Sequence, residues 1–409
     1  MQVGVLTSDG RLLFATRVAR MFGYGLLSVV LVLYLVALGI DGLWVGAILT
    51  LTLLGDAAIS LWLTTHADRL GRRTVLLTGA GLMLAAGLVF AVARDPWILL
   101  LAATVGVISP SGNEVGPFLA VEQAALSQTL PDRQRTRVFG WYNLVGSLAT
   151  ASGALGAGLL AQLLQGAGAG VVDSYRAIVV AYALVAIALA ALFWRLSPAI
   201  EVPKPAITSI ATRLGLHRSR GIVLRLAALF SLDAFAGGFV MQSLIAYWFH
   251  VRFGAPPGAL GAIFFGANIL AGFSALAAAR LAGRIGLINT MVFTHIPSNL
   301  LLIAVPLMPN LQLAVGVLLA RFAISQMDVP TRQSYTMAVV DPDERSAAAG
   351  VTGIARSLGA AVSPSLATPM VQSVPLAGLP FVIAGVLKIG YDLLVYRGFR
   401  SVRPPEEAE

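Results

Sequence analysis

Twelve charged side chains lie inside long apolar runs of this chain, where their chemistry is constrained. An ionisable group at the centre of a bilayer costs roughly 2.5–3.5 kcal/mol on insertion scales, so it pairs with an opposite charge or lines a wet cavity. Such groups carry protons or bind charged ligands when their partners change. In chain order they are Arg17, Arg20, Asp56, Glu114, Glu122, Asp233, Arg321, Asp328, Arg332, Arg356, Lys388 and Asp392.

Arg20 and Asp233 occupy equivalent places in two of these runs, 213 residues apart. If the runs are related by a pseudo-twofold axis, the two side chains lie at one depth on opposite walls of a central cavity. Their pairing predicts a gate, or a site where substrate or a proton competes for the ion pair. The alternative is that each bonds within its own half of the molecule, with Arg20 bound to Glu114 or Glu122.

The segment from Ser109 to Pro117 reads Ser-Pro-Ser-Gly-Asn-Glu-Val-Gly-Pro. Two prolines and two glycines this close together interrupt the helical hydrogen-bond ladder. Exposed backbone groups at membrane depth are tolerated only beside protein or cavity water. We therefore predict that Asn113 and Glu114 form the substrate or coupling site, with Glu114 as the proton carrier. The alternative is a structural kink in which an arginine satisfies Glu114.

A matching element lies in the tenth apolar run, where Arg321 precedes Gln326, Asp328 and Pro330. Interrupted helices at corresponding places in two halves of a membrane protein point to a binding site. We therefore expect Arg321 and Asp328 to belong to the same site as Glu114.

The remaining membrane-depth charges divide into three sets. Arg356 and Lys388 give the later runs a cationic interior, which favours an anionic ligand unless Asp328 and Asp392 neutralise it. Asp56 lies in the middle of its run and is expected to support a nearby charged turn. Four residues lie within about two helical turns of a run's end and are expected to snorkel to the membrane surface. These are Arg17, Glu122, Arg332 and Asp392.

The apolar runs that carry these charges dominate the composition. Hydrophobic residues make up 57% of the chain and charged residues 11%, whereas soluble domains carry roughly 25% charged residues. We count twelve runs of membrane-spanning length, since about 20 apolar residues cross a bilayer as a helix. Their limits are 12–39, 43–65, 75–93, 97–127, 136–164, 175–196, 222–250, 257–282, 287–307, 310–339, 347–371 and 376–396.

Lysines and arginines in the connections predict the orientation of the chain. Seventeen lie on the side that holds both termini, and three (Arg94, Arg176 and Arg252) lie on the other. Under the positive-inside rule, both termini are cytoplasmic. The net charge of +9 is then topogenic, and we expect no nucleic-acid partner.

The chain lacks the residues that several other kinds of chemistry require. The chain has no cysteine, which excludes disulfides and thiolate metal sites. Its four histidines show no metal-ligand spacing, and no Gly-Lys-Ser/Thr phosphate loop is present. No set of nucleophile and base converges in the sequence. We expect no metal, no cofactor, no ATP-driven transport and no enzyme activity.

Three segments recur along the chain at nearly constant spacing. The cationic turn at 64–73 maps onto 279–288 at an offset of 215 residues, and the first run maps onto the seventh at 213. The Pro-Asp pair at 131–132 maps onto 342–343 at an offset of 211. Parallel repeats of a six-span unit are an architecture of secondary transporters. The predicted units are an N-terminal half at 1–197, a cytoplasmic linker at 198–220, a C-terminal half at 221–399 and a tail at 400–409.

The first copy of the turn carries a family resemblance. Asp68-Arg69-Leu70-Gly71-Arg72-Arg73 resembles the signature turn between the second and third spans of the major facilitator superfamily, with Thr64 where that family has glycine. Gly71 permits a turn conformation that a β-carbon resists. The resemblance covers essentially the whole chain and implies alternating access. It also implies that the conformational switch depends on Asp68, Arg69, Gly71, Arg72 and Arg73.

Two motifs of antiporters in that family are absent from this chain. The fourth span has no arginine, although Arg321 in the tenth span resembles a displaced counterpart. The fifth span has no Gly-Pro pair, and its glycines favour close helix packing instead. These glycines are Gly146, Gly153, Gly156 and Gly158.

The sequence therefore predicts an all-α integral membrane protein with twelve transmembrane helices in two pseudo-symmetric six-helix halves. The expected function is proton-coupled efflux of a small organic molecule by alternating access. The protein is expected to work as a monomer in the lipid bilayer of a bacterial-type inner (plasma) membrane. Proton-coupled uptake of an organic anion is the first alternative, and a membrane sensor that does not transport is the alternative from another class.

Overall fold

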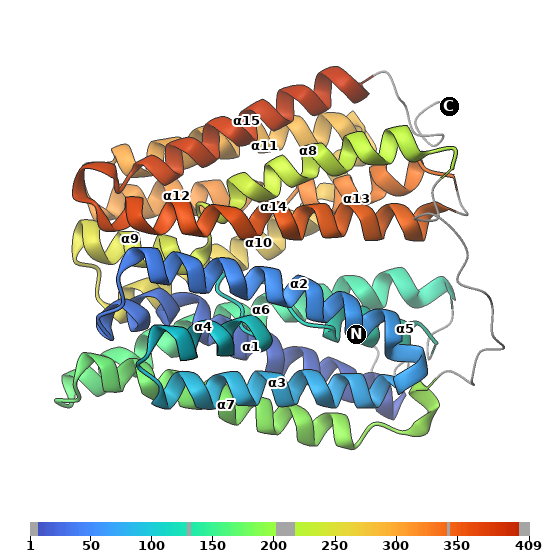
Figure 1. Cartoon of the computed structure of the whole chain (residues 1–409). Helices are drawn as coiled ribbons and strands as arrows, with labels where there is room; N and C mark the ends of the chain where they lie inside the picture. Colours follow the sequence, from blue (N-terminus) through green and yellow to red (C-terminus); the bar gives the residue numbers. More distant parts are fainter. Residues whose placement is uncertain (1–6, 129–131, 202–216, 342–343, 401–409) are drawn as a thin grey trace.

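The computed structural model describes residues 7–128, 132–201, 217–341 and 344–400, and all regular structure in these ranges is helical. Figure 1 shows the helices running along one common direction in two stacked groups. The first group comprises α1 (Ser8–Ala37), α2 (Gly42–Leu70), α3 (Arg72–Val92), α4 (Pro96–Val105), α5 (Phe118–Gln128), α6 (Asp132–Gly166) and α7 (Val171–Trp194). The second comprises α8 (Arg220–Gly238), α9 (Gln242–Phe253), α10 (Pro257–Ile285), α11 (Leu287–Ala304), α12 (Leu311–Ser325), α13 (Asp328–Ala338), α14 (Arg345–Gln372) and α15 (Leu379–Phe399).

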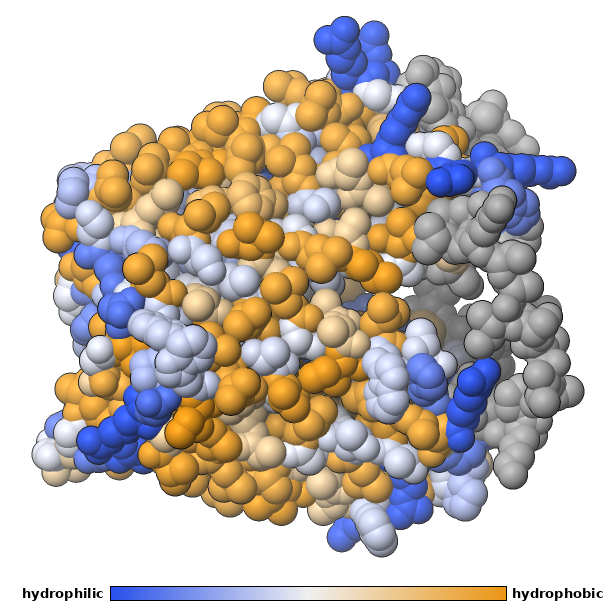
Figure 2. Space-filling view, viewed as in Figure 1, coloured by the Kyte–Doolittle hydropathy of each residue, from blue (hydrophilic) through white to orange (hydrophobic). Residues whose placement is uncertain are grey.

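The predicted all-α membrane fold is confirmed. Ten helical stretches of the described chain are long and apolar enough to cross a membrane, and apolar residues cover the visible flank in Figure 2. Two predicted runs fall outside those ten. The fourth run is divided between α4 and α5, and α14 is interspersed with serine, threonine and glycine. Each of the twelve predicted runs coincides with one helix or with a pair of consecutive helices.

Three spans are interrupted near their middle. The predicted break in the fourth span is confirmed, because α4 ends at Val105 and α5 begins at Phe118. The break predicted in the tenth span lies at Gln326 and Met327, between α12 and α13. A third break separates α8 from α9 at 239–241 and was not predicted, because that stretch lacks proline and reads as a continuous apolar run.

The two groups of helices pack together mainly through α2 against α14 and α6 against α10. Close approach of α6 and α10 depends on glycine, since a β-carbon built on Gly158 would lie 2.3 Å from the carbonyl oxygen of Pro257. A β-carbon on Gly153 would lie 2.1 Å from the carbonyl oxygen of Phe22 in α1. The interpretation of these glycines as packing residues is thus confirmed at both positions.

The two copies of the charged turn have the same backbone form. Gly71 links α2 to α3 with φ +93°, and Gly286 links α10 to α11 with φ +85°. Positive φ at both places requires glycine, and the two glycines are separated by the offset of 215 residues seen in the sequence. The duplication is therefore visible in conformation as well as in residue type.

Polar contacts between the two groups gather away from the end where Arg400 lies. Among described residues, the hydrogen bonds that join the groups are Gln242 to Ser28 (2.6 Å), Ser243 to Pro110 (3.2 Å), Thr50 to Ser365 (2.8 Å) and Gly258 to Gln162 (2.9 Å). Figure 2 shows a hollow between the groups on the opposite side, towards the end of α15. On the visible flank, the two groups are thus joined by hydrogen bonds towards one end and separated by this hollow towards the other.

Candidate functional site

The charges of the first group gather around the break in the fourth span. Arg20 of α1 binds Glu122 of α5 through two hydrogen bonds of 2.7 Å, and its Nε donates to Glu114 at 2.8 Å. Arg17, one turn earlier, also donates to Glu114. Tyr142 of α6 donates to Glu122 from the far side. Two arginines and two glutamates therefore form one balanced network, which we call the N cluster.

The position of Glu114 within the N cluster differs from that of Glu122. Glu122 is completely buried, whereas 15% of the Glu114 side chain is accessible. Asn113 beside it is exposed, and its carbonyl oxygen accepts a hydrogen bond from Ser109 at 2.7 Å. Glu114 is held by Arg17 and Arg20, which is the arrangement that the alternative interpretation predicted.

Asp56 helps to fix the interrupted segment. Its carboxylate accepts from the backbone N–H of Gly116 at 2.6 Å and from Ser60 at 3.1 Å. Gly116 has φ +80°, so this hydrogen bond secures the point where the chain turns back into α5. The expectation that Asp56 supports the charged turn was wrong, because its hydrogen bonds go to Ser60 and Gly116 and not to the turn at 64–73.

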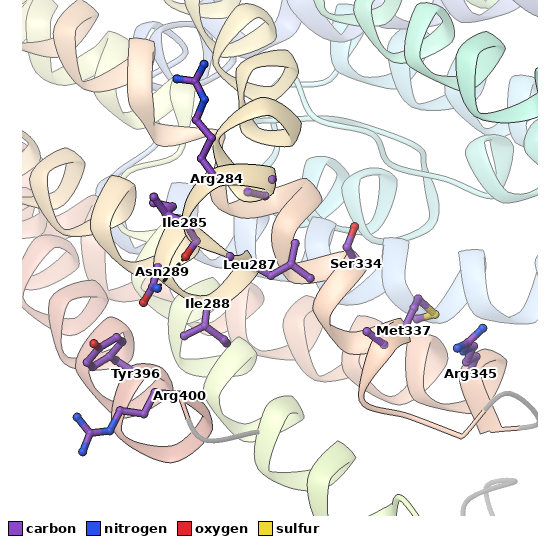
Figure 3. Close-up of a pocket in the computed structure, with 14 residues that line it drawn as sticks. Arg284, Ile285, Leu287, Ile288, Asn289, Ser334, Met337, Arg345, Tyr396 and Arg400 are labelled. Atoms are coloured by element: carbon purple, nitrogen blue, oxygen red, sulfur yellow. Dashed lines mark hydrogen bonds between the residues drawn. The ribbon is translucent and has the colours of Figure 1, made fainter. Parts of the chain in front are cut away.

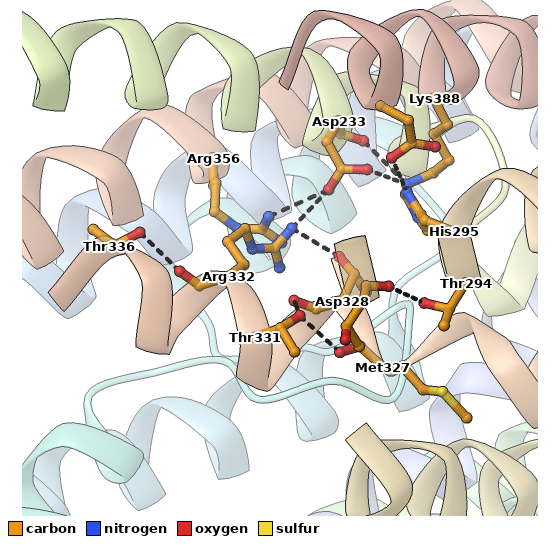
Figure 4. Close-up of polar contacts among 12 residues, drawn as sticks. Asp233, Thr294, His295, Met327, Asp328, Thr331, Arg332, Thr336, Arg356 and Lys388 are labelled. Atoms are coloured by element: carbon orange, nitrogen blue, oxygen red, sulfur yellow. Dashed lines mark hydrogen bonds and ion pairs between the residues drawn. The ribbon is translucent and has the colours of Figure 1, made fainter. Parts of the chain in front are cut away.

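The charges of the second group form a denser network, the C cluster, around Asp233 of α8. Its carboxylate contacts Lys388 at 2.5 Å, Arg332 at 3.0 Å and Arg356 at 3.3 Å, so that α15, α13 and α14 converge on it (Figure 4). Arg332 also binds Asp328, one helical turn earlier in α13, at 3.1 Å. About a third of the Arg356 side chain (35%) is accessible, whereas the other members are buried.

A third polar group lies beside the C cluster. The ring of His295 in α11 hydrogen-bonds with Asp392 of α15 at 2.8 Å, and Asn299 donates to the same carboxylate at 3.1 Å. The carboxylate of Asp392 therefore has its own hydrogen-bond partners outside the C cluster. It lies one helical turn from Lys388 but does not pair with it.

Arg20 and Asp233 do not pair in this conformation. Each has its full complement of partners within its own group of helices, as the alternative interpretation predicted. The predicted pairing failed because it considered only the symmetry of the two positions. Counter-ions within each half lie closer in the fold and satisfy both side chains.

The expectation of snorkelling was wrong for four residues. Arg17, Glu122, Arg332 and Asp392 are buried, with accessibilities of at most 6%, and all four make ion pairs or hydrogen bonds at depth. A signal for Arg332 was available in the sequence, since it follows Asp328 by four residues on one helix. Glu122 follows Glu114 by eight residues, but the break between them conceals that relationship.

Arg321 of α12 differs from the other membrane-depth cations. It is buried, with 8% accessibility, and its guanidinium lies 5.0 Å from the ring of Phe322. Within the described chain it makes no hydrogen bond or ion pair, and its Nε is buried without a partner. The carboxylates of Asp328 and Asp233 act on it electrostatically.

The signature turn is held by a carboxylate from beyond α7. Backbone N–H groups of Arg72 and Arg73 donate to Glu201 at 2.7 and 3.0 Å. The carboxylate thereby provides acceptors for the first N–H groups of α3 and places a negative charge at the positive end of its dipole. The guanidinium of Arg73 lies over the ring of Trp194, and Arg69 is exposed. The side chain of Asp68 lies outside the described part of the structure.

A pocket of about 990 Å³ lies apart from both clusters, at the end of the second group near Arg400 (Figure 3). Its walls come from the turn between α10 and α11, from α13 and from the end of α15, and they include Arg284 and Arg345. None of the twelve membrane-depth charges lines it. The pocket is therefore a surface feature of that end and does not belong to the central site.

Comparison with known proteins identifies what this arrangement resembles. The family model described as Major Facilitator Superfamily matches residues 13–364. An uncharacterized membrane protein of Saccharomyces cerevisiae is 30% identical over 424 residues, an alignment that covers 96% of this chain and 94% of the yeast protein.

Two solved structures share the fold. A bacterial homologue of the human lysosomal transporter Spinster, inward-facing and unoccupied, matches with a TM-score of 0.74 and 14% identity over 96% of this chain and 97% of that one. The nucleoside transporter NupG matches with a TM-score of 0.72 and 14% identity over 97% of this chain and 99% of that one. At these identities the likeness establishes the architecture only.

Proposed function

This chain belongs to the major facilitator superfamily, and we propose that it is a proton-coupled secondary transporter that exports a small organic molecule by alternating access. The two halves, 1–197 and 221–399, would rock about the N and C clusters, joined by the linker at 198–220. The observation that carries the proposal is Glu114. This carboxylate stands in a helix break at membrane depth, partly accessible and shared between Arg17 and Arg20.

Protonation of Glu114 would change the charge balance of the N cluster. With both glutamates ionised, two arginines face two carboxylates. A proton on Glu114 would leave Arg17 without an anionic partner, since Glu122 is bound by Arg20. That loss favours a rearrangement of α1 against the interrupted segment, and in this way a proton is coupled to the conformational change.

The open end supports a specific assignment of conformation. The hydrogen bonds between the halves lie on the side away from Arg400, and the signature turn lies on the open side. If the termini are cytoplasmic, as the basic connections predict, the molecule is inward-facing. Export is our preferred direction because the switch motif at Arg69, Gly71, Arg72 and Arg73 is retained. The membrane is a plasma membrane in this proposal, and a single copy of the chain suffices.

The second candidate function is proton-coupled uptake of an organic anion. It is supported by the cationic side chains of the C cluster, where Lys388, Arg332 and Arg356 surround one aspartate. Transport assays in liposomes distinguish export from uptake, because the two require pH gradients of opposite sign. In liposomes that are acidic inside, a proton antiporter accumulates its substrate as protons leave, whereas a symporter accumulates substrate only when the interior is alkaline.

The coupling role of Glu114 is tested in the same liposomes. Glu114→Gln is expected to abolish the dependence of flux on the pH gradient while retaining exchange of substrate for substrate. The matched control is Asp173→Asn, which neutralises an exposed carboxylate outside the clusters. Normal pH-driven accumulation by E114Q would remove Glu114 from the coupling mechanism. A compound that binds but shows no flux under either gradient would favour the sensor.

A further inference from the structure

The guanidinium of Arg321 lies on the buried face of α12. Ala314, Leu318, Arg321 and Ser325 share that face, as their spacing of three to four residues requires, and all four are buried. The hydroxyl of Ser325, one turn beyond Arg321, is also buried without a hydrogen-bond partner in the described structure. Two unpartnered polar groups therefore lie one helical turn apart, directly before the break in the tenth span.

Every other deeply buried cation at this depth has a carboxylate partner. Arg17 and Arg20 bind glutamates in the N cluster. Arg332 and Lys388 bind aspartates in the C cluster. A buried guanidinium without an anion is unfavourable at membrane depth, so Arg321 is the place where the described network is incomplete.

The charge balance of the second half shows the same gap. The N cluster has as many carboxylates as arginines. Among its arginines, lysine and carboxylates, the second half places four cationic side chains (Arg321, Arg332, Arg356 and Lys388) at membrane depth with three carboxylates (Asp233, Asp328 and Asp392). One positive charge is in excess, and it belongs to the residue that lacks a partner.

We propose that Arg321, together with Ser325, binds the carboxylate group of a monoanionic organic substrate at the break between α12 and α13. This inference rests on the proposed transport function and names the class of molecule that is carried. The start of α13 lies at the same break, where the side chain of its cap residue Met327 makes no capping hydrogen bond and Asp328 is the acidic residue of the first turn. The positive end of the helix dipole favours an anion there, and Asp328, matched by Arg332, leaves room for one further negative charge only.

The chemistry favours a carboxylate over a phosphate. One planar guanidinium fork and one hydroxyl match the two oxygens of a carboxylate. A phosphate monoester would bring a second negative charge close to Asp328, which acts electrostatically on Arg321 and is itself matched by Arg332. The single excess charge is neutralised by a monoanion and overcompensated by a dianion.

Thermal unfolding of the full-length protein in detergent tests the proposal with sodium acetate as the probe. Acetamide supplies the neutral isostere, sodium phosphate supplies the competing anion, and sodium chloride keeps the ionic strength equal. We expect acetate to raise the Tm of the wild type by about 2 °C and acetamide to leave it unchanged. Arg321→Gln is expected to weaken apparent acetate binding at least tenfold, since a charge-assisted hydrogen bond is lost.

A second measurement needs no ligand. Because Arg321 is unpaired, Arg321→Gln is expected to leave the Tm unchanged or higher, whereas Arg332→Gln is expected to lower it by removing the partner of Asp328. A fall in the Tm of R321Q as large as that of R332Q would overturn the proposal. Equal protection of wild type and R321Q by acetate, or no protection of the wild type, would overturn it too. Stronger protection by phosphate would overturn the carboxylate assignment.

These measurements involve neither a membrane nor a gradient. Loss of acetate binding would therefore leave proton coupling at Glu114 standing, and absence of pH-driven flux would leave the anion site at Arg321 standing. The two proposals fail separately.

Discussion

Arg20 and Glu122 face each other through two parallel hydrogen bonds of 2.7 Å, and neither side chain is accessible to solvent. The fork of the guanidinium matches the carboxylate, which is the strongest geometry for an ion pair of this kind. The pair joins α1 to α5 directly after the interrupted segment. It therefore fixes the far end of the loop that carries Glu114.

Breaking this pair from one side is expected to destabilise the protein. Arg20→Gln leaves the buried Glu122 without a cationic partner, and Glu122→Gln leaves Arg17 and Arg20 to share Glu114 alone. An uncompensated buried charge costs about 3–5 kcal/mol, and thermal unfolding in detergent measures the loss. The double variant R20Q/E122Q is expected to lose clearly less than the sum of the single variants. Strict additivity would mean that the two side chains are not coupled. Arg20→Asp combined with Asp233→Arg is expected to give no rescue, because those residues do not touch.

The amide of Gln242, at the start of α9, links the two halves. It donates to Ser28 of α1 at 2.6 Å, so Gln242→Ala removes a contact that exists only while this end is closed. One hydrogen bond contributes about 1 kcal/mol net, so we expect about a fivefold shift towards opening. Spin labels on cysteines at Ala37 and Arg252 would report it as a longer distance, without prior removal of cysteines because the chain has none.

The matched control for this gate is Asn268→Ala. Asn268 donates to the oxygen of the same glutamine at 3.1 Å but lies in the same half. Its loss is expected to leave the distance distribution close to that of the wild type. If Gln242→Ala and Asn268→Ala lengthen the distance equally, the contact between the halves does not by itself keep this end closed. The rigidity of the Gln242 side chain would then be the cause.

What the sequence predicted well was periodic or local. The breaks in the fourth and tenth spans followed from Pro110, Pro117 and their neighbouring glycines and from the polar residues near Asp328, since these act on the backbone where they stand. Pairing between distant residues was poorly predicted. Glu122 reaches Arg20 only because the loop before α5 folds back, and burial of Arg332 depends on helices contributed by residues up to 99 positions away. Such contacts depend on tertiary packing, which cannot be inferred from a local stretch of sequence.

A side chain at position 71 is expected to strain the backbone of the turn between α2 and α3. The φ of +93° at Gly71 is unfavourable for L-residues, and the nearest atoms to an added β-carbon lie 3.5 Å away, so the penalty is one of backbone conformation and not of crowding. Gly71→Ala should therefore lower stability by about 1–2 kcal/mol and slow transport. Gly81→Ala, in the open middle of α3, is the control and should stabilise by about 0.5–1 kcal/mol. Equal effects on the Tm would contradict the assignment of strain.

Glu344 provides a pH dependence outside the membrane-spanning helices. Burial alone would raise the pKa of its carboxyl, but the backbone N–H groups of His217, Arg218 and Ser219 donate to it and lower the pKa from 4.5 to about 2. Because the folded pKa lies below the unfolded one, the carboxylate stabilises the fold above about pH 4.5, and that stabilisation is lost as the pH falls towards 2. Glu344→Gln should therefore lower the Tm at pH 7, and its deficit relative to the wild type should shrink below pH 4.5. Thermal unfolding at a series of pH values measures the difference in Tm between Glu344→Gln and the wild type, with Asp173→Asn as an exposed control. A difference that stays constant down to acidic pH would show that the charge of Glu344 does not hold the start of α8.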